Sequence, residues 1–184
     1  ATQFVGEHMA GLGLDVEYPT WTKSGYANRN VIGERTGIRN PGDIYIIGGH
    51  LDDMPNGSTA PGADDNASGS AAILIAADIL SQYQWGCTLR FAFWTGEEQG
   101  LLGSSVYAAG AKADGETVRG YLNLDMLGYN STAPRNVDLY YRVTPTGSEQ
   151  IADTFMEVVN LYGLDLTPIK YNVATYSTGT RSDN

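Results

Sequence analysis

Three short segments of the chain are apolar almost without interruption, instead of alternating between apolar and polar residues. They cover residues 44–49, 89–94 and 121–124. Continuous hydrophobicity of this kind is typical of a strand whose two faces are both covered, as in the centre of an α/β sheet. We therefore predict that these segments are central strands.

Helical periodicity and turn residues predict the elements around these strands. Apolar positions at helical spacing predict helices over residues 3–12, 67–83, about 101–113 and about 147–162. Shorter strands are predicted at roughly 16–22, 30–35 and 137–143, and two of the apolar segments extend to strands over 88–95 and 119–127. This alternation predicts an α/β fold, with a single domain in which a mixed, mostly parallel central sheet lies between helix layers.

Each central strand is followed by residues that can bind a divalent metal ion or transfer a proton. His50 and Asp52 follow the first strand, Glu97 and Glu98 follow the second, and Asp125 comes directly after the third apolar segment. In open α/β sheets the ligand crevice lies outside the carboxyl ends of the strands. The strands should therefore deliver these side chains to one place, and we predict a metal centre there.

Taken singly, most of these motifs also have a purely structural interpretation. A histidine at a strand end is often just hydrogen-bonded, and acidic residues such as Asp65 and Glu97 are common at helix starts. Asp125 is harder to explain in this way, because it lies in an apolar segment where an unpaired carboxylate is costly.

Taken together, the motifs favour a metal ion. Five carboxylates gathered without counter-charge would repel one another strongly, and the motifs contain neither Lys nor Arg. One imidazole combined with carboxylates favours Zn²⁺ over Mn²⁺ or Co²⁺.

The composition excludes several kinds of partner. The chain of 184 residues carries 21 acidic and 11 basic residues, which is no electrostatic footprint for nucleic acid or an anionic membrane. It has no stretch of eighteen apolar residues, so we expect no membrane span. No basic-then-hydrophobic leader precedes the first helix, so we expect that any export signal has been removed and that the protein is secreted to the extracellular space.

The motifs and their order resemble those of a known family. Gly-Gly-His-Leu-Asp at 48–52, Gly-Ala-Asp-Asp-Asn-Ala-Ser-Gly at 62–69, Thr-Gly-Glu-Glu-Gln-Gly-Leu-Leu-Gly-Ser at 95–104 and Asn-Leu-Asp-Met at 123–126 resemble the co-catalytic di-zinc aminopeptidases. These belong to the clan MH metallopeptidases, whose members include glutamate carboxypeptidases, glutaminyl cyclases and the transferrin receptor ectodomain. The resemblance spans residues 1–184 but covers only about the first two-thirds of the family's catalytic domain.

The resemblance implies a role for each site residue. His50 and Asp125 would bind one zinc ion, Glu98 would bind a second, and Asp65 would bridge the two. Asp52 would be the hydrogen-bonding partner of His50, and Glu97 would be the general base. The resemblance also implies a cis peptide bond between Asp65 and the following residue.

The chain departs from the family in one respect. The second zinc ion of the family normally has a terminal histidine from a later segment, whereas this chain contains only His8 and His50. Residues 181–184 resemble a segment where the family often has Ser-Asp-His and then continues. We therefore expect that residues 1–184 form a zinc peptidase catalytic domain whose C-terminal portion is missing, and that a C-terminal remainder of the same protein is a partner.

The function implied by the resemblance is that of a zinc-dependent aminopeptidase. Metal-activated water, with Glu97 as general base, would hydrolyse N-terminal residues from peptides that have a free N-terminus. Three alternatives stay open: a non-catalytic receptor or scaffold module of the same fold, a carboxypeptidase, and a glutaminyl cyclase. The intact clustered charge argues against the first, the lack of a cationic clamp in the motifs argues against the second, and His50 argues against the third.

Overall fold

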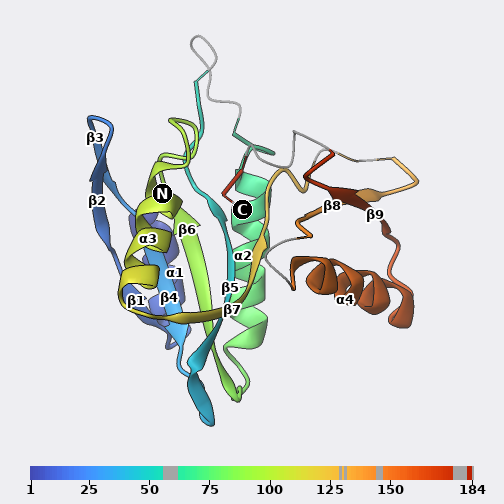
Figure 1. Ribbon diagram of the computed structural model, residues 1–184, viewed down its shortest axis with the longest axis horizontal. Coiled ribbons are helices and arrows are strands. Elements are labelled where there is room, and N and C mark those ends of the chain that lie inside the picture. Colours follow the sequence, from blue (N-terminus) through green and yellow to red (C-terminus); the bar gives the residue numbers. More distant parts are fainter. Residues whose placement is uncertain (56–61, 129, 131, 144–146, 176–181, 184) are drawn as a thin grey trace. The chain divides into compact units, whose positions relative to one another are not determined.

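The computed structural model describes the whole chain except residues 56–61, 129, 131, 144–146, 176–181 and 184 (Figure 1). The chain divides into two compact units. The first consists of residues 1–126 together with Asp183, and the second consists of the remaining described residues after 126. Each unit is described by itself below.

A five-stranded mixed sheet forms the centre of the first unit (Figure 1). Its strands, in spatial order, are β1 (Asp15–Glu17), β4 (Val31–Arg35), β6 (Cys87–Trp94), β5 (Asn40–His50) and β7 (Thr117–Asn123). β5 pairs in parallel with β6 and β7, whereas β4 pairs antiparallel with β6 and β1. The predicted α/β class with a mixed central sheet is confirmed, and the three apolar segments are the three parallel strands.

Helices cover both faces of this sheet. Helices α1 (Thr2–Gly11) and α2 (Ala67–Leu80) contribute to a core cluster on one face, and α3 (Leu102–Ala113) provides Tyr107 to a cluster on the other. Side chains alternate along a strand, so β6 supplies both clusters. Phe91 and Phe93 lie in the first cluster and Trp94 lies in the second.

The second unit contains one parallel pair of strands and one helix. β8 (Asn136–Tyr141) pairs in parallel with β9 (Thr167–Asn172), and α4 (Ser148–Leu161) connects them. Lys170 on β9 forms ion pairs with Glu149 and Asp153 on α4, at 3.2 and 2.6 Å. These pairs join the helix to the sheet.

The predicted strands differ from the observed ones where a proline or polar residues interrupt the apolar pattern of a strand. The segment predicted as one strand over 16–22 is two strands, β1 and β2 (Thr20–Lys23), because Pro19 has no N–H to continue a ladder. β2 pairs instead with β3 (Tyr26–Arg29). The strands β3 and β9 were not predicted, and β7 ends at Asn123 rather than at residue 127.

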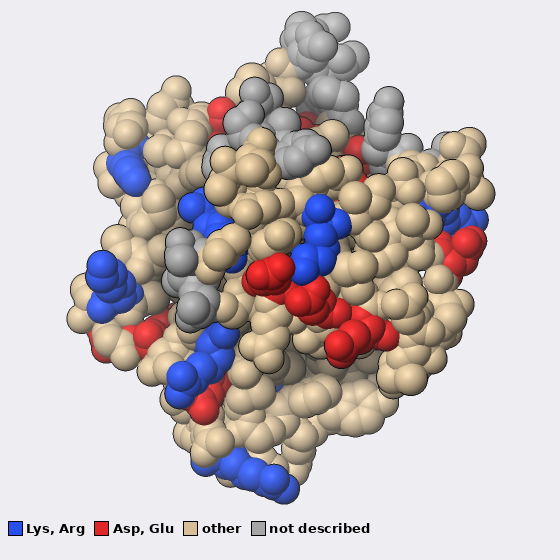
Figure 2. Space-filling model, turned by 45° about the vertical axis from the view of Figure 1, so that its right-hand side comes forward, with Lys and Arg blue, Asp and Glu red and all other residues tan. Residues whose placement is uncertain are grey.

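The surface shows no large concentration of positive charge on the face drawn in Figure 2, where basic side chains lie singly or next to acidic ones. Within the described part of the chain, none of the helices has both the length and the apolarity needed to cross a membrane.

Two glycines in helices are expected to respond in opposite ways to replacement by alanine. A Cβ at Gly69 in α2 would lie 2.4 Å from the carbonyl oxygen of Leu124 and 2.3 Å from Oδ1 of Asn66, whereas a Cβ at Gly110 in α3 would meet nothing within 4 Å. Gly69→Ala should therefore lower the free energy of unfolding by about 1–3 kcal/mol through overpacking. Gly110→Ala should raise it by about 0.5–1 kcal/mol, since alanine is the better helix former. Urea unfolding of both variants checks this, and a stabilised Gly69→Ala variant would contradict the close packing.

Candidate functional site

His50 is the last residue of β5, in the middle of the parallel part of the sheet, and its side chain is 1% exposed. Its Nδ1 lies 3.0 Å from the backbone carbonyl oxygen of Asp52. A carbonyl oxygen can only accept a hydrogen bond, so Nδ1 carries the hydrogen and donates it. Nε2 is thereby the ring nitrogen that is left to bind either a proton or a metal ion.

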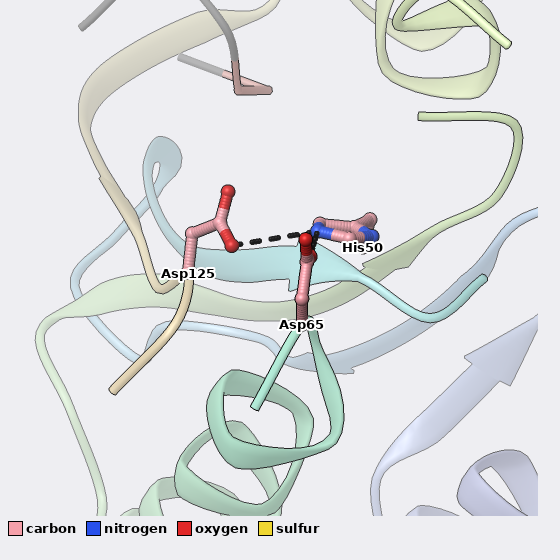
Figure 3. Close-up of side chains that lie close together, drawn as sticks. All are labelled: His50, Asp65 and Asp125. Atoms are coloured by element: carbon pink, nitrogen blue, oxygen red, sulfur yellow. Dashed lines mark ion pairs between the residues drawn. The ribbon is translucent and has the colours of Figure 1, made fainter. Parts of the chain in front are cut away.

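Asp65 and Asp125 both approach this Nε2 atom (Figure 3). Their Oδ1 atoms lie 3.1 and 3.4 Å from it, respectively. Asp65 belongs to the loop before α2 and Asp125 to the segment after β7, so three separate parts of the chain meet here. One ligand atom from each residue lies within 4.8 Å of the other two. Since zinc binds nitrogen and carboxylate oxygen at about 2.0–2.2 Å, small movements of the carboxylates would bring all three atoms to one ion.

The electrostatics of His50 show how strongly this site favours a cation. Burial lowers the pKa of His50, but the hydrogen bond and charge of Asp125, the charge of Glu97 and the carbonyl of Asp52 outweigh it and raise the pKa to about 9. The carboxylates thus hold a proton on the imidazole well above its usual range. A metal ion at the same place would replace that proton as the positive charge.

Asn66 connects the two segments that carry the aspartates. Its side chain is 2% exposed, and its Oδ1 accepts hydrogen bonds from the backbone N–H groups of Gly69 and Met126, at 2.9 and 3.3 Å. Its Nδ2 donates to the carbonyl oxygen of Leu124 at 2.8 Å. Asn66 is the N-cap of α2, and the predicted cis peptide bond between Asp65 and Asn66 is present.

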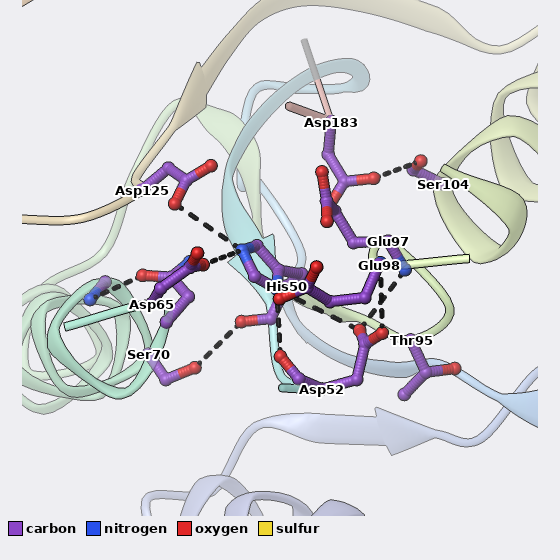
Figure 4. A network of polar contacts seen from close by, with 12 residues as sticks. His50, Asp52, Asp65, Ser70, Thr95, Glu97, Glu98, Ser104, Asp125 and Asp183 are labelled. Atoms are coloured by element: carbon purple, nitrogen blue, oxygen red, sulfur yellow. Dashed lines mark hydrogen bonds and ion pairs between the residues drawn. The ribbon is translucent and has the colours of Figure 1, made fainter. Parts of the chain in front are cut away.

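Asp52 connects the end of β5 to the loop after β6 (Figure 4). Its carboxylate accepts hydrogen bonds from the backbone N–H groups of Glu97 and Glu98, at 3.3 and 3.2 Å. Its Oδ1 atom lies 4.0 Å from Nδ1 of His50, which is beyond hydrogen-bonding distance. Asp52 therefore orients His50 with its carbonyl and holds the Glu97–Glu98 backbone with its carboxylate.

Glu97 and Glu98 lie in the same electrostatic environment as the three converging residues. Burial raises the pKa of Glu97 to about 7, opposed by the charge of His50 and reinforced by nearby carboxylates, Asp183 first among them. Burial and the charge of Asp65 raise the pKa of Glu98. Among the described residues, the group with mutually close ligand atoms consists of His50, Asp65 and Asp125 without Glu98, so a second ion at Glu98 stays a prediction.

Asp183 is a site residue that the sequence did not identify. Its side chain is 6% exposed, and it accepts a hydrogen bond from Oγ of Ser104 on α3. Burial raises the pKa of Asp183 to about 6. The hydrogen bond from Ser104 and the charge of His50 lower this pKa, whereas the charges of Asp52 and Asp125 raise it. In the sequence Asp183 is only a part of the last segment, because its proximity to Glu97 arises from tertiary structure.

A comparison of the chain with known protein families finds one family that matches it. The model of peptidase family M28 matches residues 30–184, which include every residue of the site. The chain belongs to peptidase family M28. The resemblance read from the four motifs is thereby confirmed at the level of the family.

Similar proteins agree with membership of family M28. A probable leucine aminopeptidase 2 of Aspergillus oryzae is 33% identical over 165 residues, which are 85% of this chain and 32% of that protein. The crystal structure of LapB from Legionella pneumophila has a TM-score of 0.78 at 21% identity, covering 99% of this chain and 49% of that one, and shows the shared fold. An aminopeptidase from Aneurinibacillus sp. strain AM-1 has a TM-score of 0.63 at 30% identity, covering 85% and 35%. The M28 chain described here thus spans about a third of the length of the curated relatives it matches.

Asn66 is expected to be essential for the stability of the loop that holds Asp65. Asn66→Asp keeps the acceptor oxygen but removes the donor to Leu124 and buries a further negative charge, so the free energy of unfolding at pH 7 should fall by about 1–3 kcal/mol. Asn28→Asp, at an exposed position on β3, makes the same charge change and should alter stability by less than about 0.5 kcal/mol. Equal unfolding midpoints for the two variants in urea would contradict this role of Asn66.

Proposed function

We propose that this M28 chain carries the catalytic centre of a zinc-dependent aminopeptidase that removes N-terminal residues from peptides. The observation that supports this most directly is the convergence of His50, Asp65 and Asp125 beside Glu97. The names of the relatives, which include leucine aminopeptidases, point to the same activity. Secretion to the extracellular space and completion of the site by a C-terminal portion stay predictions.

The residues present suit a zinc centre. His50, Asp65 and Asp125 would hold one ion, and Glu98 would hold a second one together with Asp65, giving two ions in a complete site. When bound, such ions lower the pKa of a water molecule towards about 7 and stabilise negative charge on the substrate carbonyl oxygen.

Glu97 is proposed as the group that moves the proton. A base works best when its pKa lies near the working pH, and burial places the pKa of Glu97 at about 7 in the metal-free chain. Its carboxylate would accept a proton from the attacking water and then deliver it to the departing amine. Asp52 assists without touching the substrate, because its carboxylate holds the backbone N–H of Glu97.

The alternative activities differ in what they require of these residues. A non-catalytic module would keep repelling carboxylates together without benefit. A carboxypeptidase would need a cationic side chain for the substrate carboxylate, and a cyclase would act on glutaminyl peptides. Hydrolysis of leucine 4-nitroanilide, compared with cyclisation of a glutaminyl peptide and hydrolysis of an N-blocked peptide, separates these possibilities.

Zinc is expected to stabilise the folded protein through His50. Added to the metal-free protein at about 100 times the dissociation constant, zinc should increase the free energy of unfolding by about 2.7 kcal/mol, because it binds the folded state. This stabilisation is measured as a zinc-induced rise in the melting temperature, and the rise should disappear in His50→Ala. It should persist in His8→Ala, which removes the other histidine, paired with Asp78 on α2. An equal zinc-induced rise in wild type and His50→Ala would exclude His50 as a ligand.

Glu97→Gln is expected to abolish most of the activity while leaving the zinc site in place. Glutamine has the same shape but cannot accept the proton, so kcat for leucine 4-nitroanilide should fall by at least about a hundredfold. Zinc content and the circular dichroism spectrum should be those of wild type. Glu157→Gln, at an exposed position on α4, is the matched control and should retain full activity. Full activity of Glu97→Gln would remove this residue from the mechanism.

A further inference from the structure

Asp183 carries a carboxylate oxygen that is buried but unused. Ser104 Oγ donates a hydrogen bond to its Oδ1. The Oδ2 atom is also buried, and it has no hydrogen-bond partner among the residues that the structure describes. An ionised carboxylate in this situation is costly unless a donor or cation completes it. A ligand that donates a hydrogen bond to Oδ2 would remove this cost.

The buried oxygen belongs to the same group of carboxylates as the proposed base. Figure 4 shows Asp183 next to Glu97, with Ser104 on its other side. The charge of Asp183 is also the strongest of the carboxylate influences that raise the pKa of Glu97. A ligand that satisfies Asp183 would thus lie within reach of the reacting groups.

The chemistry of the proposed substrate limits what this ligand can be. Two zinc ions would bring four positive charges to the five carboxylates of Asp52, Asp65, Glu97, Glu98 and Asp125, so they leave Asp183 without a counter-charge. Every peptide with a free N-terminus carries one cation close to the scissile carbonyl group, whatever its side chains are. This cation is its α-ammonium group. An ammonium group supplies three N–H donors and forms strong, charge-assisted hydrogen bonds with carboxylates.

We propose that Oδ2 of Asp183 accepts a hydrogen bond from the α-ammonium group of the substrate. Asp183 is then a specificity-determining residue that selects peptides with an unblocked N-terminus. Ser104 is a positioning residue, because its hydroxyl holds the other carboxylate oxygen and so fixes the orientation of Oδ2. This inference rests on the proposed aminopeptidase function, since it assigns the ligand of one residue in that site.

Two inhibitors that differ only in the amino group test this assignment. Leucine hydroxamate and 4-methylpentanohydroxamate share the zinc-binding hydroxamate and the side chain, but only the first carries the ammonium group. Their binding to the zinc-loaded, full-length protein is measured by isothermal titration calorimetry. Asp183→Asn should weaken leucine hydroxamate by at least about tenfold, because a charge-assisted hydrogen bond is lost. It should leave 4-methylpentanohydroxamate unchanged within about twofold.

The controls separate recognition from a general loss of structure. Asp114→Asn removes one negative charge from an exposed position after α3 and should affect neither inhibitor. Equal weakening of both inhibitors by Asp183→Asn would mean a merely structural role, and no weakening would mean that another group holds the amine. Either result overturns the proposal.

Two further measurements keep the test decisive. If Asp183→Asn does not fold, as judged by circular dichroism, Ser104→Ala keeps the charge but releases the carboxylate. This variant should selectively weaken leucine hydroxamate, and unchanged selectivity would overturn the proposal. Failure of the proposed function is recognised separately, because wild type would then not hydrolyse leucine 4-nitroanilide while the inhibitor pair still reports on Asp183.

Discussion

The repulsion among carboxylates at the carboxyl end of the parallel strands is the constraint on which the rest of the site depends. Asp125 and Glu97 raise the pKa of the His50 imidazole to about 9 despite burial, and Asp65 lies 3.1 Å from its Nε2. Such an arrangement persists only when a cation is present, whether a proton or a metal ion. The site therefore favours a cation, and a divalent ion bound at the same place would reduce the repulsion further.

The scaffold prevents these groups from moving apart. β5 is held between β6 and β7, so the position of His50 is fixed by hydrogen bonds on both sides. Asn66 fastens the start of α2 to the segment after β7, and the carboxylate of Asp52 fastens the loop after β6. The contacts of the Asn66 side chain and of the Asp52 carboxylate with the backbone thus hold the acidic residues in place. Basic side chains could also do this, but they would compete with a metal ion for the carboxylates.

The convergence of His50 and Asp125 could be predicted from the sequence because it depends on a simple rule, whereas Asp65 was expected there from the family resemblance. Parallel buried strands are recognisable from continuous apolar residues, and their carboxyl ends meet at one edge. The separate contacts of Asp52 could not be predicted, because spacing does not reveal which of its oxygens faces His50. The backbone carbonyl oxygen lies 3.0 Å from Nδ1 of His50, and the carboxylate Oδ1 lies 4.0 Å from it. The strands β3 and β9 were missed for a different reason: each mixes a few apolar residues with polar ones, and the pairing with a neighbouring strand cannot be seen in the sequence.

The place of Asp183 in the site cannot be predicted from the local sequence pattern. It is separated by 79 positions from Ser104, which donates to it, and nothing in its neighbouring residues indicates burial. Family membership alone does not settle its role either, since one fold can host several activities that depend on particular side chains. What distinguishes Asp183 physically is the contrast between its two oxygens, one satisfied by a hydroxyl and one buried without a described partner. A carboxylate that served only to stabilise the fold would gain by satisfying both oxygens within the protein, so the asymmetry itself argues that the second oxygen is kept for a ligand.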